Sequence, residues 1–246
     1  MTDAHCHVSC GDPSVRELLV GRDFFGVHPW ETLDGTAGTR RASVPDVPSL
    51  AALRSALRAK LVANPAAGVG EIGLDRLKAR DVSPLMRDVF EAQLALALEL
   101  RRPVVLHGAK CWGQVVAAVR ALSSRQDQTQ AIGQSGNRTL PPLLFHGFSR
   151  SDGLIPEIVE LGGFISVGPA VLNDHAVNYR ALVGKVPLDR LLVETDRTEA
   201  NAAACPSVRD VLEKVAELRG GSAAELERAT DENAERFVGP ACDILV

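Results

Sequence analysis

Short apolar segments alternate with longer amphipathic segments along most of this 246-residue chain. In residues 84–100 the apolar side chains recur at helical spacing, and in residues 49–63 they do so between a capping Ser49 and Pro65. The apolar runs between such segments are too short for helices and have the length of buried strands. This alternation predicts an α/β fold in which helices cover a parallel sheet.

The pattern also gives expected boundaries. We expect about seven strands, at residues 1–8, 24–29, 67–72, 103–106, 143–145, 164–167 and 191–193. We expect helices at residues 49–63, 84–100, 112–122, 154–161, 176–183, 207–218 and 223–237, and one helical turn at 16–20. A closed eightfold barrel requires one strand more.

The loops differ in composition. Residues 32–48 are rich in Gly, Thr and Pro and should form a loop. Residues 123–141 are polar, rich in Gln, Ser, Gly and Thr, and are expected to be a flexible insertion. Because no internal repeat and no linker is visible, we expect residues 1–246 to form a single domain.

Imidazole and carboxylate groups stand at the ends of the expected strands: His5, His7, Glu71, His107, His146 and Asp196. Asp3 shares a strand face with the first two histidines. The carboxyl ends of parallel strands meet at one edge of a sheet, so these side chains are expected in one pocket. The alternative is a set of unrelated polar residues that cap helices or bond loops.

Such a mixture of ligands binds borderline or hard divalent cations, and a carboxylate can bridge two of them. We assign His5 and His7 to one ion and His107 and His146 to a second, with Glu71 as the bridge. Asp196 would contact the first ion and take the proton of an attacking water. Cys6 and Cys10 are expected to be small apolar groups, with soft ligation as the alternative.

Composition excludes several classes of protein. Hydrophobic residues make up 46% and charged residues 24% of the chain, and no apolar run is long enough to span a bilayer. No signal peptide precedes His5, and an odd count of five cysteines predicts reduced thiols. We therefore expect a cytoplasmic protein (or a nuclear one, in a eukaryote). The net charge of −4 argues against a broad surface for duplex DNA.

Six motifs occur in the order found in the TatD family, which comprises metal-dependent deoxyribonucleases of the amidohydrolase-like superfamily. They are Asp-Ala-His-Cys-His (3–7), Gly-Val-His-Pro (26–29), Gly-Glu-Ile-Gly-Leu-Asp (70–75), Val-Leu-His (105–107), Phe-His-Gly-Phe-Ser (145–149) and Pro-Leu-Asp-Arg-Leu-Leu-Val-Glu-Thr-Asp (187–196). The chain resembles this family over nearly its whole length, since Asn233 to Gly239 also looks like the family's closing helix.

The resemblance implies a distorted TIM-type (β/α) barrel that hydrolyses phosphodiester bonds of DNA with two divalent ions (Zn, Mg or Mn). Each of the six strand-end residues matches a family ligand position, and Glu71 stands where many relatives carry a carboxylated lysine. His28 matches a motif residue and is expected to orient a ligand or a loop. His175 matches nothing and is expected on the surface.

The chain departs from the family pattern at four places. The interval from His7 to Phe24 is too short for a helix and a full second strand, so one βα unit near the N-terminus should be lacking. Lys110 follows His107 where relatives usually have an Arg nearby, and it would hold a phosphate as a point charge. Arg150 stands where a Gly is usual.

The fourth departure is Arg197, where relatives have a small residue. Arg150 and Arg197 are candidate phosphate contacts; the alternatives are a solvated helix start for the first and a reshaped loop for the second. Trp30 and Trp112 follow strand ends and are candidates for stacking on a base, with packing beneath the loops as the alternative.

Three functional hypotheses follow. The leading one is a two-metal nuclease whose substrate is single-stranded DNA or DNA ends. The second is a hydrolase of another ester or amide, for example an aminoacyl-tRNA deacylase, because the same ions would activate water for it. The third is a scaffold that has kept the fold without catalysis. The sequence leaves the metal, the direction of attack and the oligomeric state open.

Overall fold

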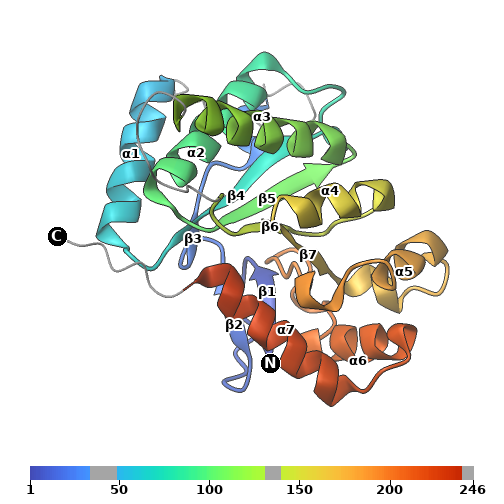
Figure 1. Ribbon diagram of the computed structural model, residues 1–246. Helices are drawn as coiled ribbons and strands as arrows, with labels where there is room; N and C mark the ends of the chain where they lie inside the picture. Colours follow the sequence, from blue (N-terminus) through green and yellow to red (C-terminus); the bar gives the residue numbers. More distant parts are fainter. Residues whose placement is uncertain (34–48, 131–139, 240–246) are drawn as a thin grey trace.

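The computed structural model describes residues 1–33, 49–130 and 140–239 (Figure 1). All strand pairings in these ranges are parallel, with β1 and β2 in one sheet and β3 to β8, in sequence order, in the other. The strands are β1 (Thr2–Cys6), β2 (Arg16–Leu19), β3 (Phe24–Phe25), β4 (Gly68–Asp75), β5 (Val104–Ala109), β6 (Leu143–Phe145), β7 (Phe164–Val167) and β8 (Leu191–Val193).

The helices fall close to the positions expected from sequence. They are α1 (Leu50–Ala63), α2 (Pro84–Leu100), α3 (Trp112–Gln130), α4 (Ile155–Glu160), α5 (Val177–Val183), α6 (Val208–Arg219) and α7 (Ala223–Val238). A serine side chain accepts a backbone N–H at the start of α1, α2, α6 and α7, which explains why those boundaries were predicted well. Four short 3₁₀ turns complete the described structure: η1 (Pro29–Thr32), η2 (Asp152–Leu154), η3 (Pro169–Leu172) and η4 (Leu188–Arg190).

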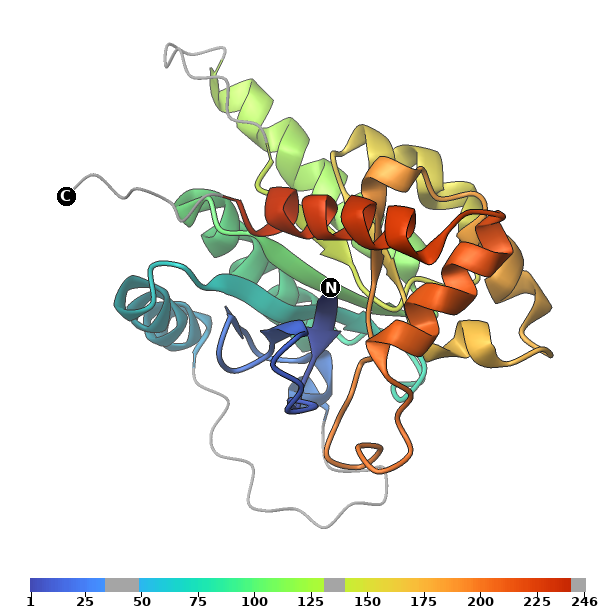
Figure 2. The same ribbon diagram turned by 90° about the horizontal axis from the view of Figure 1, so that it is seen from below.

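Hydrogen bonds at two seams join the two sheets into a ring (Figure 2). At one seam Val20 bridges Phe24 in parallel fashion. At the other, the Asp196 amide donates to the His5 carbonyl at 3.0 Å, and the His7 amide donates to the Arg197 carbonyl at 2.8 Å. The expected distorted (β/α) barrel is therefore confirmed, with the distortion at the two seams.

The N-terminal region corrects the prediction. Residues 16–19 form a strand instead of a helical turn, so the ring has eight strands and not about seven. Leu18 and Leu19 are buried and pair with β1, and this pairing outweighs the local helix preference of the segment. The connections from β1 to β2 and from β2 to β3 are fully described and contain no helix. The βα unit expected to be missing near the N-terminus therefore lacks only its helix, and its strand is present as β2.

The expected flexible insertion at 123–141 needs a second correction. Helix α3 continues to Gln130, eight residues beyond the predicted end at Leu122. Residues 131–139 of that insertion lie outside the described residues, as do residues 34–48 of the expected loop at 32–48.

Helix α7 lies across the amino-terminal end of the ring (Figure 2). Its Ala234 and Phe237 pack with inward-facing residues of the strands, and the Phe237 ring stacks on Phe24 at 5.7 Å. The amino group of Met1 forms ion pairs with Glu227 at 3.3 Å and with Asp231 of the same helix. The carboxyl ends of the strands, at the opposite end, are therefore free to form a site.

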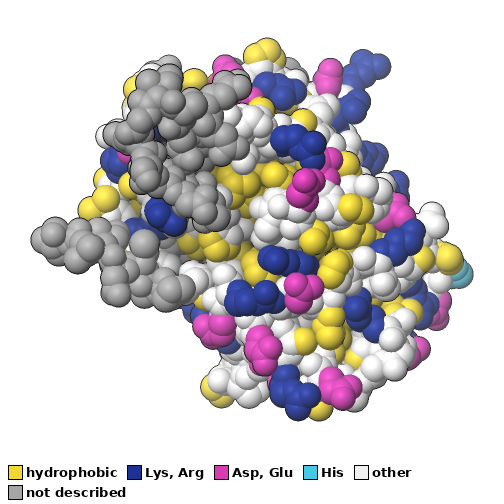
Figure 3. Space-filling view, viewed as in Figure 1, with side chains coloured by type: hydrophobic (Ala, Val, Ile, Leu, Met, Phe, Trp, Pro, Cys, Tyr) yellow, Lys and Arg dark blue, Asp and Glu magenta, His cyan; other side chains and the backbone are white. Residues whose placement is uncertain are grey.

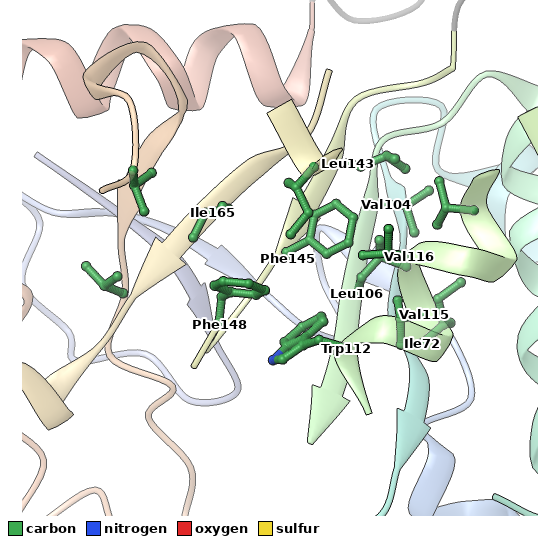
Figure 4. Packing of buried hydrophobic residues seen from close by; sticks show 14 of the residues in the cluster. Ile72, Val104, Leu106, Trp112, Val115, Val116, Leu143, Phe145, Phe148 and Ile165 are labelled. Carbon is green, nitrogen blue, oxygen red and sulfur yellow. The ribbon is translucent and has the colours of Figure 1, made fainter. Parts of the chain in front are cut away.

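Trp112 belongs to the main hydrophobic core, which lies between the sheet and the outer helices (Figure 4). It is 4% exposed, and its ring lies 5.8 Å from Phe145 and 5.2 Å from Phe148. A side chain at Gly108 would collide with this ring, so the indole fixes the backbone directly after His107. Trp112 therefore packs beneath the loops and is not a stacking platform.

The face shown in Figure 3 carries interspersed basic and acidic side chains, without a broad basic area among the residues described. No helix in the described part of the chain is long and apolar enough to cross a bilayer.

Candidate metal centre

Glu71 lies at the centre of a cluster formed at the carboxyl ends of the strands. Its side chain is 3% exposed. One carboxylate oxygen, Oε2, lies 3.4 Å from His5 Nε2 and 3.3 Å from His7 Nε2. The other, Oε1, lies 2.5 Å from His107 Nδ1 and 2.6 Å from His146 Nε2. The two oxygens therefore face two different pairs of imidazoles.

Asp196 completes the cluster on the side of β1. Its Oδ1 lies 3.8 Å from His5 Nε2 and 3.5 Å from His7 Nε2, and its side chain is half exposed. The His146 ring lies only 4.1 Å from that of His5, so it connects the two halves of the cluster. The structure thus brings together all six residues predicted as ligands.

Three sets of possible ligand atoms lie within 4.8 Å of one another: His5–His7–Glu71, His5–His146–Asp196 and His28–Glu71–His107. Both ring nitrogens of His5 are buried and have no hydrogen-bond partner among the described residues. A buried polar atom without a partner is unfavourable, and a cation at Nε2 would remove that cost. Mixed imidazole and carboxylate donors suit borderline or hard divalent ions. The residues present therefore fit a metal.

The charges of the cluster depend on one another. Burial opposes ionisation of Glu71, but the charge of His146 and a hydrogen bond with His107 outweigh it and hold the pKa of Glu71 well below its ordinary value. Burial lowers the pKa of His146, yet Glu71 and Glu194 raise it well above the usual range. Hydrogen bonds to Asp196 and then to Glu71 raise the pKa of His7 to about 9. A metal must therefore compete with protons for these imidazoles.

Asp75 contacts the ring nitrogen of His107 that faces away from Glu71. Its Oδ2 lies 3.0 Å from His107 Nε2 and also accepts the indole N–H of Trp30 at 2.7 Å. Its Oδ1 accepts the amides of Leu77 and Lys78. With the Nε2 proton directed at Asp75, Nδ1 of His107 is left facing Glu71, the arrangement by which carboxylates commonly fix metal-binding histidines.

Glu194 occupies a corresponding place near His146. Its side chain is 1% exposed; Oε1 accepts the Gly147 amide at 2.7 Å, and Oε2 accepts the Ser166 hydroxyl. Oε1 lies 3.6 Å from His146 Nδ1, too far for a hydrogen bond but close enough to favour the charged ring. Asp75 and Glu194 were not singled out from sequence. The sequence did offer a signal for both. Asp75 is the last residue of the apolar strand that carries Glu71, and Glu194 directly follows the apolar strand that leads to Asp196.

Asp3 joins β1 to the end of β8. Its carboxylate accepts the Thr195 amide at 3.0 Å, the Thr195 hydroxyl at 2.6 Å and the His5 amide at 3.3 Å. Cys6 is buried and its thiol lies 3.9 Å from the Leu18 carbonyl. Burial raises the pKa of the Cys6 thiol, as for a small apolar group in the core. Cys10 is exposed.

His28 contacts the Glu71 carboxylate. Its Nδ1 accepts the Trp30 amide at 3.1 Å, so the proton of the neutral ring is on Nε2. Nε2 then donates to Glu71 Oε1 at 3.2 Å. This geometry fits the orienting role expected for His28.

The residues predicted to bind substrate differ in their exposure and in their contacts with the rest of the protein. Trp30 is 43% exposed beside the cluster, with the Lys78 ammonium 3.0 Å from its ring centroid. Lys110 and Arg150 are exposed on the loops that follow His107 and His146. The Arg197 guanidinium donates to the Ala202 carbonyl at 2.5 Å, which favours the alternative that it shapes its own loop. His175 is exposed, as expected.

Comparison with curated proteins gives related hydrolases. The chain is 28% identical to YabD, an uncharacterised metal-dependent hydrolase of Bacillus subtilis (strain 168), over 179 residues. That match covers 69% of this chain and 64% of YabD, less than two thirds of its length. The chain is 27% identical to the 3′-5′ ssDNA/RNA exonuclease TatD of Citrobacter rodentium over 226 residues, which are 87% of this chain and 75% of that protein.

Solved structures agree on the fold. The TatD homologue YJJV from Escherichia coli K12 has a TM-score of 0.61 at 25% identity, over 94% of this chain and 79% of that one. A TatD-family hydrolase from Entamoeba histolytica has a TM-score of 0.60 at 14% identity, over 91% of this chain and 75% of its own; it supports the fold alone. The family profile described as TatD related DNase matches residues 21–239, which include four of the six clustered residues. The chain therefore belongs to the TatD-related DNase family of metal-dependent hydrolases.

Proposed function

We propose that this protein is a two-metal deoxyribonuclease that hydrolyses phosphodiester bonds in single-stranded DNA or at DNA ends. The observation that carries the proposal is the division of Glu71 between two pairs of imidazoles, His5 with His7 and His107 with His146. One carboxylate between two ligand pairs is suited to bridging two cations.

In this proposal His5, His7 and Asp196 would hold one cation, His107 and His146 would hold the other, and Glu71 would contact both. When bound, such ions neutralise charge on a phosphate oxygen and make water more acidic. His28 and Asp75 keep Glu71 and His107 in the orientation that this binding requires.

Asp196 takes the proton of the attacking water on its second carboxylate oxygen, because Oδ1 faces His5 and His7 and would hold the cation. Burial opposes its ionisation, but the hydrogen bond with His7 outweighs burial and places the pKa of Asp196 below its ordinary value. The group is therefore ionised near neutral pH and can accept a proton. Its half-exposed side chain is within reach of both water and substrate.

Substrate contacts come from the loops around the cluster. Lys110 supplies positive charge for a phosphate at the metal centre, without a bidentate geometry. The exposed part of Trp30 provides a surface on which one base stacks. A single strand or a frayed end fits this site better than an intact duplex, because the net charge is −4 and basic groups are few near the cluster.

The test combines metal analysis with a substrate panel. Protein purified without chelator should contain close to two divalent ions per chain and should release nucleotides from short single-stranded DNA with Mg²⁺, Mn²⁺ or Zn²⁺. Intact DNA together with hydrolysis of an aminoacyl-tRNA or another ester, at equal metal loading, would replace the nuclease with a different hydrolase. Absence of both metal and hydrolysis would support the scaffold.

A further inference from the structure

A groove of about 1,050 Å³ lies beside the cluster, between the loop after β6, the loop after β7 and helix α5. Asp196 and Glu194 are among its lining residues, so the groove is continuous with the candidate metal centre. Its volume reaches the upper end of ordinary small-ligand pockets, about 300–1,000 Å³. A single small ester would fill only part of it, whereas a polymer would extend along it.

Some charged side chains of the groove have partners within the protein, and others do not among the described residues. Lys185 is paired with Asp152. Glu194 is buried, and its oxygens are taken by the Gly147 amide and the Ser166 hydroxyl. Arg150 is exposed and pairs with no carboxylate among the described residues. It is therefore the cation most available to an incoming anion.

The backbone conformation of Arg150 also supports a role for this residue in binding an anion. Its φ of +58° lies in the left-handed region, where glycine fits without cost and a long side chain does not. Unfavourable backbone conformations at non-glycine residues cluster at binding sites, where the surrounding structure maintains them. The Arg150 side chain thus lines the groove from the loop after β6.

The rest of the lining combines apolar side chains with polar ones, among them His175 and Asn178. Pro169, Val177 and Leu182 also line the groove, and the side chain of Val177 is 67% exposed. The Tyr179 hydroxyl accepts the Gly168 amide at 2.8 Å and so ties α5 to the loop after β7. Apolar patches next to the Arg150 guanidinium complement a single nucleic-acid strand, whose bases and sugars are apolar on their faces and whose phosphates are anionic.

We propose that this groove holds the nucleotides adjoining the scissile phosphate of a single DNA strand, and that Arg150 binds a phosphate of that segment. The proposal rests on the proposed nuclease function for the identity of the polymer. It predicts that Arg150 matters for long substrates and not for those that end at the metal centre.

The kinetic test compares Arg150→Ala with the wild type on dT12 and on bis(p-nitrophenyl) phosphate. KM for dT12 should rise about five- to tenfold with kcat nearly unchanged, and the dependence of log(kcat/KM) on log[salt] should weaken by about 0.7, as for one lost phosphate contact. Hydrolysis of the small diester should not change. Arg228→Ala removes an equally exposed arginine of α7 outside the groove and should leave all three quantities unchanged.

A second variant changes the charge without removing a residue of the loop. Asn178 is exposed and lines the groove, so Asn178→Lys should lower KM for dT12 and Asn178→Glu should raise it. Equal KM values in all of these variants would overturn the groove assignment.

Binding separates the failure of this proposal from the failure of the nuclease. Labelled dT12 is titrated into Glu71→Gln protein, which should not cleave it, with and without Arg150→Ala. Weaker binding in the double variant supports the groove even if no DNA hydrolysis is found. Hydrolysis of the small diester by the wild type together with no binding of dT12 would overturn the groove and leave the metal-dependent hydrolase intact.

Discussion

The two halves of the candidate metal centre are supported in different ways. On the β5 side, His107 is held by Asp75, which is itself held by the Trp30 indole and two backbone amides. On the β1 side, both ring nitrogens of His5 lack a hydrogen-bond partner in the described chain. The protein alone therefore fixes the ring of His107 on the β5 side, although Nδ1 of His146 also lacks a partner in the described chain, whereas the ring of His5 depends on the cation that it would bind.

The largest effect should come from the group that both halves share. Glu71→Gln keeps the shape of the side chain but removes the charge that faces both imidazole pairs. We expect hydrolysis to fall by more than about a hundredfold, beyond the 10- to 100-fold typical of residues behind a ligand. Elemental analysis should find fewer than two ions per chain. Full activity at full metal loading would show that Glu71 is not the bridge.

Asp75→Asn should reduce hydrolysis by the next largest amount. The substitution weakens the contact that orients His107, and so affects only the β5 side of the candidate metal centre. The amide can no longer act as a charged acceptor for both His107 and Trp30. We expect metal affinity to drop about 10- to 100-fold at one of two sites. Metal titration followed by calorimetry measures this, with Asp81→Asn as an exposed acidic control. An equal loss at both sites would contradict the division into two halves.

Metal removal should loosen the β1 half selectively. A ligand present at about 100 times its Kd stabilises the folded state by about 2.7 kcal/mol, and chelation removes this contribution. Hydrogen exchange should then increase in residues 5–7 and 195–197, where β1 meets the end of β8, and change little in residues 104–109. Uniform exchange across both regions would mean that the two halves do not differ.

The smallest effect concerns pH. In the metal-free protein the pKa of His7 is about 9, raised by Asp196 and Glu71. A raised histidine pKa means that the folded protein holds this proton up to about pH 9, so any cation must displace it at pH 7. The Kd for the metal should fall about tenfold from pH 7 to pH 8, and this slope should decrease in His7→Asn. A Kd independent of pH would contradict the proton competition.

Local signals explain what the sequence predicted well. Helices α1 and α2 begin at capping serines and carry regular apolar spacing, so both were located to within a residue. The six clustered residues were found because strand ends are visible in the sequence and parallel strands must place them at one edge. Neither inference requires knowledge of distant contacts.

Non-local contacts explain what the sequence missed. Strand β2 exists because it pairs with β1, and residues 16–19 alone favour a helix. The end of α3 has too few apolar residues to indicate that it continues to Gln130. The bond between Trp30 and Asp75 spans 45 positions, and the burial of Trp112 depends on Phe145 and Phe148. These contacts join residues that are far apart in the sequence, so no local pattern predicts them.

Helix α7 has a consequence for biosynthesis. It covers the ring at the end remote from Glu71 and contacts Met1, just before β1, and Phe24 of β3, yet it follows all eight strands in the sequence. A nascent chain therefore carries the histidines of β1 before helix α7, which covers that end of the ring, has been synthesised. Because β1 and α7 lie far apart in the sequence, their contact is a long-range one that closes late in folding.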